Sequence, residues 1–560
     1  MTTSRAAGSA APSNTGKRSW WRRHYTFCGT TLGLAFVWMS LTPSLLPRGP
    51  VYQGLLSGSA GAIGYALGVF AVRLARFMAA KRRSRRAPRW AWLALIAFAV
   101  AGSTVMLVWF QLWQDILRDT MGMPRLQWHD YPLIATVAVV VLFGLVEAGQ
   151  LLGRLFRFLE CKLSSVVPRR VSAVIVTFLL VALTVGLLNG VVVDFVMDKV
   201  NSTFSAANQE MGPEAARPAT GLRSGGPGSL VSWQALGRQG RRFVSSGPTR
   251  QQLSAFNGAP ALQPIRAYAG LDAARDIEAG AELATRELER AGGLQRSVVA
   301  VATTTGTGWL NEAEAAALEY LCNGDSAIVT MQYSYLPSWI SFVVDRSNAR
   351  QAGRALFDAV ARRVRAMPAG KRPKLVVFGE SLGSFGAEAP FETIDNLVAR
   401  TDGALFSGPP SANPIWTQVT SHRDPGSPQW LPIYRNGETV RFAADSQDLG
   451  RPAAPWGRPR VVYLQHASDP VVWWSPDLLI RKPDWLSEPR GGAVSPRMEW
   501  IPIITFMEVT ADLTVATQVP AGFGHRYVGA VAGAWAAILQ PPGWTPAKTA
   551  RLAPLLTAPE

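Results

Sequence analysis

Three residues far apart in the chain have the types and the order of a nucleophile, an acid and a base. Ser381 lies at the centre of a Gly-x-Ser-x-Gly motif that directly follows the hydrophobic run Val376-Val377-Phe378. Asp469 comes a few residues after another apolar run, and His525 lies between a glycine and an arginine. A serine hydroxyl needs an imidazole to accept its proton and a carboxylate to orient that imidazole. The three residues therefore predict a catalytic triad that forms an acyl-enzyme on Ser381.

The surroundings of Ser381 predict a strand, a tight turn and a helix, an arrangement that lifts a serine from the edge of a parallel sheet. The two glycines of the motif leave room for this turn, and the serine is expected to have a strained backbone. An oxyanion that develops on the substrate needs hydrogen-bond donors. We expect these donors to be the backbone amide of Leu382 and amides of Thr305 and Gly306, which lie in a threonine-rich loop after an early strand. The alternative for that loop is a simple turn.

Other residues compete for the acid and base roles. Asp477 and Asp512 are alternative acids, because Asp469 could instead cap a helix. His466 directly follows a strand and is expected to be structural, and His422 is the remaining histidine of the second half. The three cysteines form no Cys-x-x-Cys pair and no Cys/His group with the spacing of metal ligands. We therefore expect neither a metal nor a cofactor.

The second half of the chain alternates short apolar runs with helical patterns. Strands are expected at 297–302, 327–333, 374–378, 404–407, 460–465 and 501–509, and helices at 311–322, 347–366 and from the serine motif to 399. This alternation is typical of a mostly parallel sheet with helices on both faces. We expect the domain to span 257–548, with a Pro-, Gly- and Trp-rich cap insertion at 409–458 and a tail at 549–560.

Positive charge is concentrated in the first half of the chain. Residues 1–250 contain 28 of the 56 Lys and Arg but only 9 of the 38 Asp and Glu, a net charge of +19. Residues 251–560 contain the other 28 Lys and Arg and 29 Asp and Glu, a net charge of −1. The basic clusters alternate with apolar stretches of about 20 residues, the length that a helix needs to cross a bilayer. This pattern favours a membrane protein over a nucleic-acid binder, which would carry its basic patch on a folded face. Five spans are expected within a membrane domain at 26–199, at 27–46, 52–72, 90–113, 132–152 and 171–196.

The charges of the loops predict the orientation of these spans. Residues 1–25, 73–89 and 154–170 together hold 18 Lys and Arg, whereas the alternate loops hold only Arg48, Arg118 and Arg125. Positively charged loops stay in the cytoplasm, so an odd number of spans puts everything after about residue 200 outside. Residues 1–25 are expected to be disordered in the cytoplasm, and residues 200–256 to be a linker.

Two features within the spans have structural interpretations. Five glycines give the second span a small-residue face for close helix packing: Gly54, Gly58, Gly61, Gly64 and Gly68. Glu147 lies toward the cytoplasmic end of the fourth span, where we expect it to pair with a neighbouring arginine.

Six segments together resemble a bacterial family of membrane-anchored α/β-hydrolases, with an N-terminal multi-span domain and a C-terminal catalytic domain. These segments are Thr305–Trp309, Gly379–Gly386, Ser407–Pro410, Arg423–Ser427, Tyr463–Pro470 and Gly524–Tyr527. The order Ser381, Asp469, His525 is also the order of the triad in that fold. The resemblance spans nearly the whole chain and implies an integral membrane protein with a serine-hydrolase domain, but it implies no substrate.

These expectations combine into one function. We expect a multi-pass protein of the cytoplasmic membrane, with an extracytoplasmic serine hydrolase domain that cleaves an ester or thioester. The membrane placement favours lipidic acyl esters and membrane lipids as partners. One alternative is a cell-envelope acyltransferase that uses the same triad, with a sugar or lipid hydroxyl in place of water. The other is a non-enzymatic membrane scaffold on a hydrolase fold, against which the intact Ser, Asp and His set argues.

Overall fold

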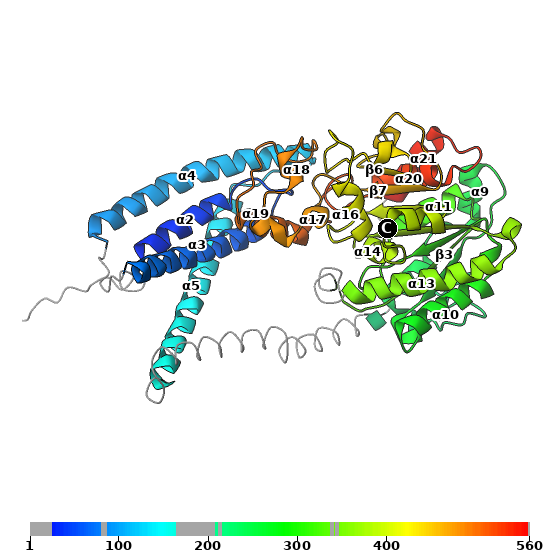
Figure 1. Cartoon of the computed structure of the whole chain (residues 1–560), viewed down its shortest axis with the longest axis horizontal. Helices are drawn as coiled ribbons and strands as arrows, with labels where there is room; N and C mark the ends of the chain where they lie inside the picture. Colours follow the sequence, from blue (N-terminus) through cyan, green and yellow to red (C-terminus); the bar gives the residue numbers. More distant parts are fainter. Residues whose placement is uncertain are drawn as a thin grey trace, which may run out of the picture. The chain divides into compact units, whose positions relative to one another are not determined.

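The computed structural model describes residues 25–79, 87–163, 208–210, 216–336, 341 and 346–557 (Figure 1). These residues fall into two compact units. The first holds the residues up to Thr42 together with Gly49–Gln111 and Gln127–Arg154, and the second holds Pro43–Arg48, Leu112–Leu126 and the described residues from Leu155 on. The segment 43–48, between two apolar helices, therefore belongs to the same unit as Ser381, and so does 112–126, which holds the end of the helix Arg89–Thr120 and the loop after it.

Three described helices are long and apolar enough to cross a membrane: α3 (Pro50–Met78), α4 (Arg89–Thr120) and α5 (Asp130–Leu163). The expected span at 27–46 is wrong, because its helix α2 (Phe27–Met39) has only 13 residues. Pro43 and Pro47 follow within the same apolar run, and proline cannot continue a helix. The expected span at 171–196 lies outside the described residues. The described part of the chain thus supports three of the five expected spans.

The glycine face of α3 packs closely against neighbouring helices, as expected. A Cβ atom added at Gly58 would lie 2.7 Å from the carbonyl oxygen of Ala138 on α5, and one at Gly64 would lie 2.7 Å from that of Leu32 on α2. Only glycine allows the helix backbones to approach to this distance.

The expected pairing of Glu147 with an arginine is also confirmed. A Glu147 carboxylate oxygen lies 3.5 Å from Arg154 Nη2, and the other accepts a hydrogen bond from the Tyr25 hydroxyl at 2.7 Å.

A seven-stranded parallel sheet forms the centre of the second unit. Its order is β1-β3-β2-β4-β5-β7-β6, and every neighbouring pair is parallel. The strands are β1 (Ile265–Ala269), β2 (Val298–Ala302), β3 (Ser326–Met331), β4 (Lys374–Glu380), β5 (Gly403–Ser407), β6 (Val440–Ala443) and β7 (Arg460–Leu464). The longer helices are α8 (Gly237–Ser245), α9 (Arg250–Asn257), α10 (Ile277–Arg290), α11 (Glu312–Leu321), α13 (Arg346–Ala366), α16 (Pro414–Ser421), α19 (Ile504–Asp512), α20 (Val528–Leu539) and α21 (Pro546–Thr557). The shorter helices are α14 (Leu382–Glu388), α15 (Ile394–Arg400), α17 (Pro470–Trp473) and α18 (Asp484–Ser487).

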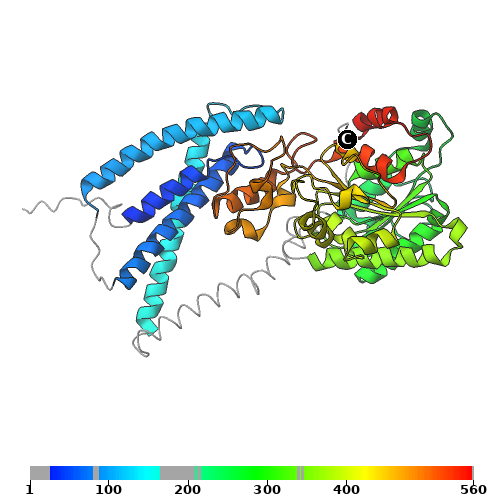
Figure 2. The same ribbon diagram turned by 45° about the horizontal axis from the view of Figure 1, so that its top comes forward.

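Helices cover both faces of the sheet because successive strand residues point to opposite sides. In β2, Val299 and Val301 pack into the core beneath α10 and α13, whereas Val298 and Ala300 pack into the core beneath α11 and α20. Figure 1 shows α10 and α13 on one side of the strands and α11, α20 and α21 on the other, and the turned view keeps this order (Figure 2). The strands predicted at 297–302, 327–333, 374–378, 404–407 and 460–465 are the central strands of this sheet.

The strand expected at 501–509 is wrong, because the chain forms helix α19 there. Its buried residues are Ile504, Thr505, Glu508, Val509 and Asp512. They recur at helical rather than alternating spacing, and two of them are acidic. The many β-branched and aromatic residues of this segment favour a strand locally, and the tertiary structure overrides that preference.

Three other parts of the second unit differ from expectation. Part of the expected cap at 409–458 is strand β6, which pairs with β7 at the edge of the main sheet, and the structure gives no separate cap. The expected linker at 200–256 contains α8 and nearly all of α9 within its described part, and the buried Arg223 contacts the carbonyl oxygens of Val244 and Ser246. The expected tail belongs mostly to α21, whose Leu552 is fully buried. Strands β1 and β6 were not expected at all.

Candidate active site

Ser381 lies in a tight turn between β4 and α14. Its backbone has φ 56° and ψ −126°, a conformation that non-glycine residues adopt only at a cost in free energy. Its amide donates a hydrogen bond to the carbonyl oxygen of Ser407, at the end of the neighbouring strand β5, at 2.8 Å. A Cβ atom at Gly379 would lie 2.5 Å from the Gly383 carbonyl carbon, and one at Gly383 would overlap the carbonyl oxygen of Thr303. The glycines of the motif therefore permit the turn sterically, as the sequence predicts.

Asp469 and His525, which the sequence places 56 residues apart, are in contact. His525 Nδ1 lies 2.7 Å from Asp469 Oδ2, and the same carboxylate oxygen accepts a hydrogen bond from the Tyr527 hydroxyl at 2.5 Å. Asp469 also caps α17, because its other oxygen accepts from the Val471 amide at 2.8 Å. The aspartate thus has both roles that the sequence left open for it.

The electrostatics of this pair follow from burial and mutual attraction. Burial opposes ionisation of Asp469, but the attraction of His525 and the hydrogen bonds outweigh it and lower the pKa of the carboxyl. Burial likewise disfavours the imidazolium of His525, but the negative charge of Asp469 outweighs it and raises the pKa of the ring. The hydrogen bond at Nδ1 leaves Nε2 as the nitrogen that can exchange a proton with a substrate or a nucleophile.

The free nitrogen of His525 lies at the same edge of the sheet as Ser381. Nε2 is 3.8 Å from a carboxylate oxygen of Glu380, the residue directly before Ser381. A side chain at Gly408, directly after β5, would overlap the imidazole. Among the described residues Nε2 has no hydrogen-bond partner. The ring therefore lies against the ends of β4 and β5, and its buried Nε2 is left without a hydrogen bond from the described residues.

The donors expected for an oxyanion differ in their geometry. Leu382 is the first residue of α14, where helix amides have no partner within the helix. The amide of Thr305 donates to the carbonyl oxygen of Trp309 at 2.9 Å, so this turn already occupies one of the expected donors. Gly306 is buried, and a Cβ there would overlap Leu336 and Ser341. The loop does border the serine turn, because Thr303 contacts Gly383.

Two family models match the chain. The model described as "Alpha/beta-hydrolase family" matches residues 265–552, and the one described as "Alpha/beta-hydrolase family N-terminus" matches residues 41–248. The chain belongs to this alpha/beta-hydrolase family. Comparisons with curated proteins and with solved structures find no significant match. The first match covers every strand of the hydrolase sheet, and the second covers the three long apolar helices.

Two of the competing residues, Asp512 and His466, have other partners. Asp512 is fully buried and forms an ion pair with Arg48 at 3.1 Å, so it is not the acid beside His525. Asp477 lies in a short 3₁₀ helix, Pro476–Leu479. His466 stacks on Tyr527 and shares a hydrogen bond at 2.8 Å with the carbonyl oxygen of Gly524, which fits the structural role expected for it. Its burial lowers the pKa of the ring.

Several buried polar residues beside the hydrolase site were not predicted. Glu380 accepts a hydrogen bond from Asn311, and Glu314 accepts one from the Ser407 hydroxyl at 2.5 Å. Burial first, and then the nearby charge of Glu380, raise the pKa of Glu314 well above its usual range. Nothing in the sequence shows that Glu380, Glu314 or Asn311 is buried, although Glu380 directly precedes the nucleophile in the motif. Among the described residues no group of three or more His, Cys, Asp or Glu side chains is arranged to hold a metal ion.

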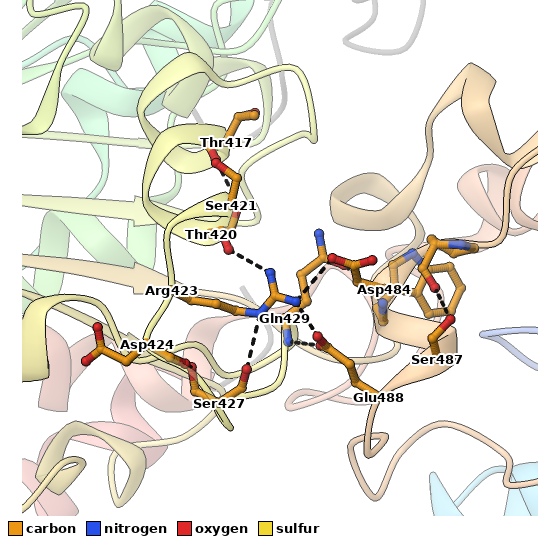
Figure 3. Close-up of polar contacts among 12 residues, drawn as sticks. Thr417, Thr420, Ser421, Arg423, Asp424, Ser427, Gln429, Asp484, Ser487 and Glu488 are labelled. Carbon is orange, nitrogen blue, oxygen red and sulfur yellow. Dashed lines mark hydrogen bonds and ion pairs between the residues drawn. The ribbon is translucent and has the colours of Figure 1, made fainter.

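The stretch Arg423–Ser427, one of the segments that carry the resemblance, has a structural role. Figure 3 shows the Arg423 guanidinium between two parts of the hydrolase unit. It donates to the carbonyl oxygens of Thr420 at 2.8 Å and Ser427 at 3.1 Å, and it pairs with Asp484 at 3.1 Å and with Glu488. Arg423 thus fixes the segment after α16 against α18.

Proposed function

We propose that the protein is a membrane-anchored serine hydrolase that cleaves an ester or thioester through an acyl-enzyme on Ser381. The observation that carries this proposal is the contact of Asp469 with His525 at 2.7 Å, with the opposite nitrogen of the ring buried and unoccupied next to the serine turn. A carboxylate that holds one imidazole nitrogen leaves the other to act as a general base.

The reaction then proceeds in two steps. Ser381 Oγ attacks the acyl carbon, its proton moves to His525 Nε2, and the same proton passes to the leaving alcohol or thiol as the tetrahedral intermediate collapses. Water attacks the acyl-enzyme in the second step, again with His525 as base. The Leu382 amide, at the N-terminus of α14, is the donor that we assign to the developing oxyanion, and each such donor contributes about 3–4 kcal/mol. With the Thr305 amide engaged in a turn, Gly306 and its neighbours in that loop are the candidates for a second donor.

The placement of the loops supports an extracytoplasmic catalytic domain. The segments 43–48 and 112–126 belong to the same compact unit as the catalytic residues. These segments contain only Arg48, Arg118 and Arg125, whereas the strongly basic segments 1–25 and 73–89 fall in the other unit. Because basic loops stay in the cytoplasm, the hydrolase domain is on the opposite side of the membrane. An anchor of apolar helices brings such a domain close to lipidic esters, which we propose as its substrate class.

A fluorophosphonate probe tests the nucleophile directly. The probe forms a bond between Ser381 Oγ and phosphorus with loss of fluoride, and it needs the same base as the reaction. We expect labelling of the wild-type protein and none of Ser381→Ala, while Ser421→Ala, a change at an exposed serine on α16, is labelled normally. Absence of labelling in all three would contradict the hydrolase and favour a non-enzymatic scaffold.

Two further measurements test the remaining parts of the proposal. Protease added to intact spheroplasts is expected to digest the hydrolase domain, and full protection would contradict the extracytoplasmic side. Product analysis with a lipid ester, with and without a hydroxyl acceptor, separates hydrolysis from transfer, because an acyltransferase releases little free acid when the acceptor is present.

A further inference from the structure

Glu380 brings a second carboxylate to the catalytic histidine. It is the last residue of β4 and is 7% exposed. Its Oε1 lies 3.8 Å from His525 Nε2, and its Oε2 accepts a hydrogen bond from the Asn311 amide. Asp469 lies at the other ring nitrogen, at 2.7 Å. The imidazole is therefore flanked by a carboxylate at each nitrogen, inside the protein.

Among the described residues, Glu380 is the acidic side chain within ion-pair distance of His525 Nε2. Tyr527 and His466 are on the Asp469 side, where the tyrosine hydroxyl bonds the aspartate and the His466 ring stacks on the tyrosine. Glu314 accepts a hydrogen bond from the Ser407 hydroxyl. Burial and then the charge of Glu380 raise the pKa of Glu314 well above its usual range.

Glu380 itself is subject to opposing effects. Burial, and to a smaller extent the charge of Asp469, raise the pKa of its carboxyl above its usual value, while the imidazolium of His525 and the Asn311 hydrogen bond oppose that rise. A charge on Glu380 and a charge on His525 therefore stabilise each other. The arrangement favours the ionised carboxylate of Glu380 most when the His525 ring is protonated. The ring is protonated while the tetrahedral intermediate exists.

We propose that Glu380 is a positioning residue of the reaction, which acts through His525 by stabilising the imidazolium at the nitrogen opposite Asp469. The inference rests on the proposed serine-hydrolase function. When Ser381 Oγ forms its bond to the acyl carbon, its proton moves to Nε2 and the positive ring lies between two carboxylates. When the intermediate collapses, that proton leaves with the alcohol or thiol and the ring is neutral again. In the enzyme without substrate, the same carboxylate keeps the His525 ring protonated to higher pH. It therefore also sets the pH below which the protonated ring can no longer act as a base.

The pH dependence of fluorophosphonate labelling tests this role, because labelling needs a neutral His525 and no known substrate. The rate is expected to rise with pH as the ring loses its proton. In Glu380→Gln the amide carries no charge, so the midpoint should fall by about one pH unit and the high-pH rate should also fall. At a pH one unit below the wild-type midpoint, the fraction of neutral His525 in the variant should then be about five times that in the wild type. Glu380→Asp keeps the charge and should stay closer to the wild-type midpoint.

Controls keep this test falsifiable. Glu392→Gln removes an exposed carboxylate that pairs with Arg354 and should leave the midpoint unchanged. If Glu380→Gln does not fold, Asn311→Ser retains an oxygen to cap α11 but withdraws the amide from Glu380, and it should lower the midpoint as well. A folded Glu380→Gln with the wild-type midpoint overturns the inference and leaves the hydrolase intact. A wild-type protein that is not labelled at any pH overturns the proposed function itself.

Discussion

Arg48 and Asp512, which are 464 positions apart in the chain, form a fully buried ion pair with 3.1 Å between Nε and Oδ1. The second oxygen of Asp512 accepts hydrogen bonds from the Ser44 hydroxyl and from the backbone amides of Leu45 and Leu46, the latter two at 3.1 and 3.3 Å. Arg48 Nη2 lies 3.5 Å from Glu508, one helical turn earlier in α19. These bonds explain why residues 43–48 belong to the hydrolase unit.

This cluster is connected to the catalytic histidine. The segment after α19 contains Ala516, whose carbonyl oxygen accepts the His525 amide at 2.8 Å. Leu46 lies beside Gly524, where an added Cβ would come within 3.4 Å of its side chain. The loop between two apolar helices therefore supports the segment that contains His525.

Replacement of Arg48 should destabilise the hydrolase unit strongly. Arg48→Ala leaves Glu508 and Asp512 buried without their cation, which costs about 3–5 kcal/mol of unfolding free energy. Chemical denaturation in detergent, followed by tryptophan fluorescence, measures this loss. Arg125→Ala is the matched control, because Arg125 pairs with Asp119 on the surface and its removal should leave the transition unchanged. Equal stability of the two variants would contradict a role for the buried cluster.

Replacement of Asp469 should slow the labelling of Ser381 without loss of the fold. Asp469→Asn keeps the shape but removes the charge that orients and stabilises the protonated ring, and the analogous change in serine proteases costs about four orders of magnitude. We expect a drop of about a thousandfold or more in the labelling rate constant. Asp477→Asn should label at the wild-type rate. The reverse result would identify Asp477 as the acid.

The close approach at the nucleophile turn predicts different effects for two glycines. In Gly383→Ala the new methyl group overlaps the Thr303 carbonyl oxygen, a backbone atom that cannot move aside, so we expect a loss of about 1–3 kcal/mol and much slower labelling. In Gly529→Ala, within α20, the methyl group meets no atom within 4 Å, and helix propensity predicts a small gain in stability. Thermal unfolding and probe labelling of both variants measure these effects. Normal labelling of Gly383→Ala would show that the turn tolerates a side chain.

Glu388 should make the protein less stable as the pH rises. Burial raises the pKa of its carboxyl to about 7, although Asn413, Tyr463 and the Ile415 amide donate hydrogen bonds to it. The unfolded chain loses this proton near its usual pKa, so stability is fully present below that value and falls as the pH rises toward 7. The contribution over this window is about 3 kcal/mol.

Glu388→Gln removes this titration. Relative to the wild type, the variant should therefore gain about 3 kcal/mol of unfolding free energy between pH 4.5 and pH 7.5, whatever its absolute stability. Denaturant midpoints across this range measure the difference. A constant difference between the two proteins would contradict the raised pKa.

Local patterns in the sequence determined much of the hydrolase unit. The run before Ser381 and its glycines predicted a strand and a turn at the positions where the structure has them, because sterics within a few residues decide that geometry. The five central strands were predictable for a similar reason, since strands buried on both faces are mostly apolar runs rather than alternating patterns. The order of Ser381, Asp469 and His525 restricted the possible triad before any contact was known. The contact of Asp469 with His525 agrees with that prediction.

Only the tertiary structure decided the features that depend on distant partners. Glu508 and Asp512 lie in a helix rather than a strand, and their role became visible only with Arg48 beside them. The apolar run at 27–46 ends its helix early, and its last residues join the hydrolase unit. Glu380 and Glu314 look like ordinary surface acids in the sequence. Their chemistry comes from burial, and burial is decided by which segments pack together rather than by any residue's neighbours in the chain.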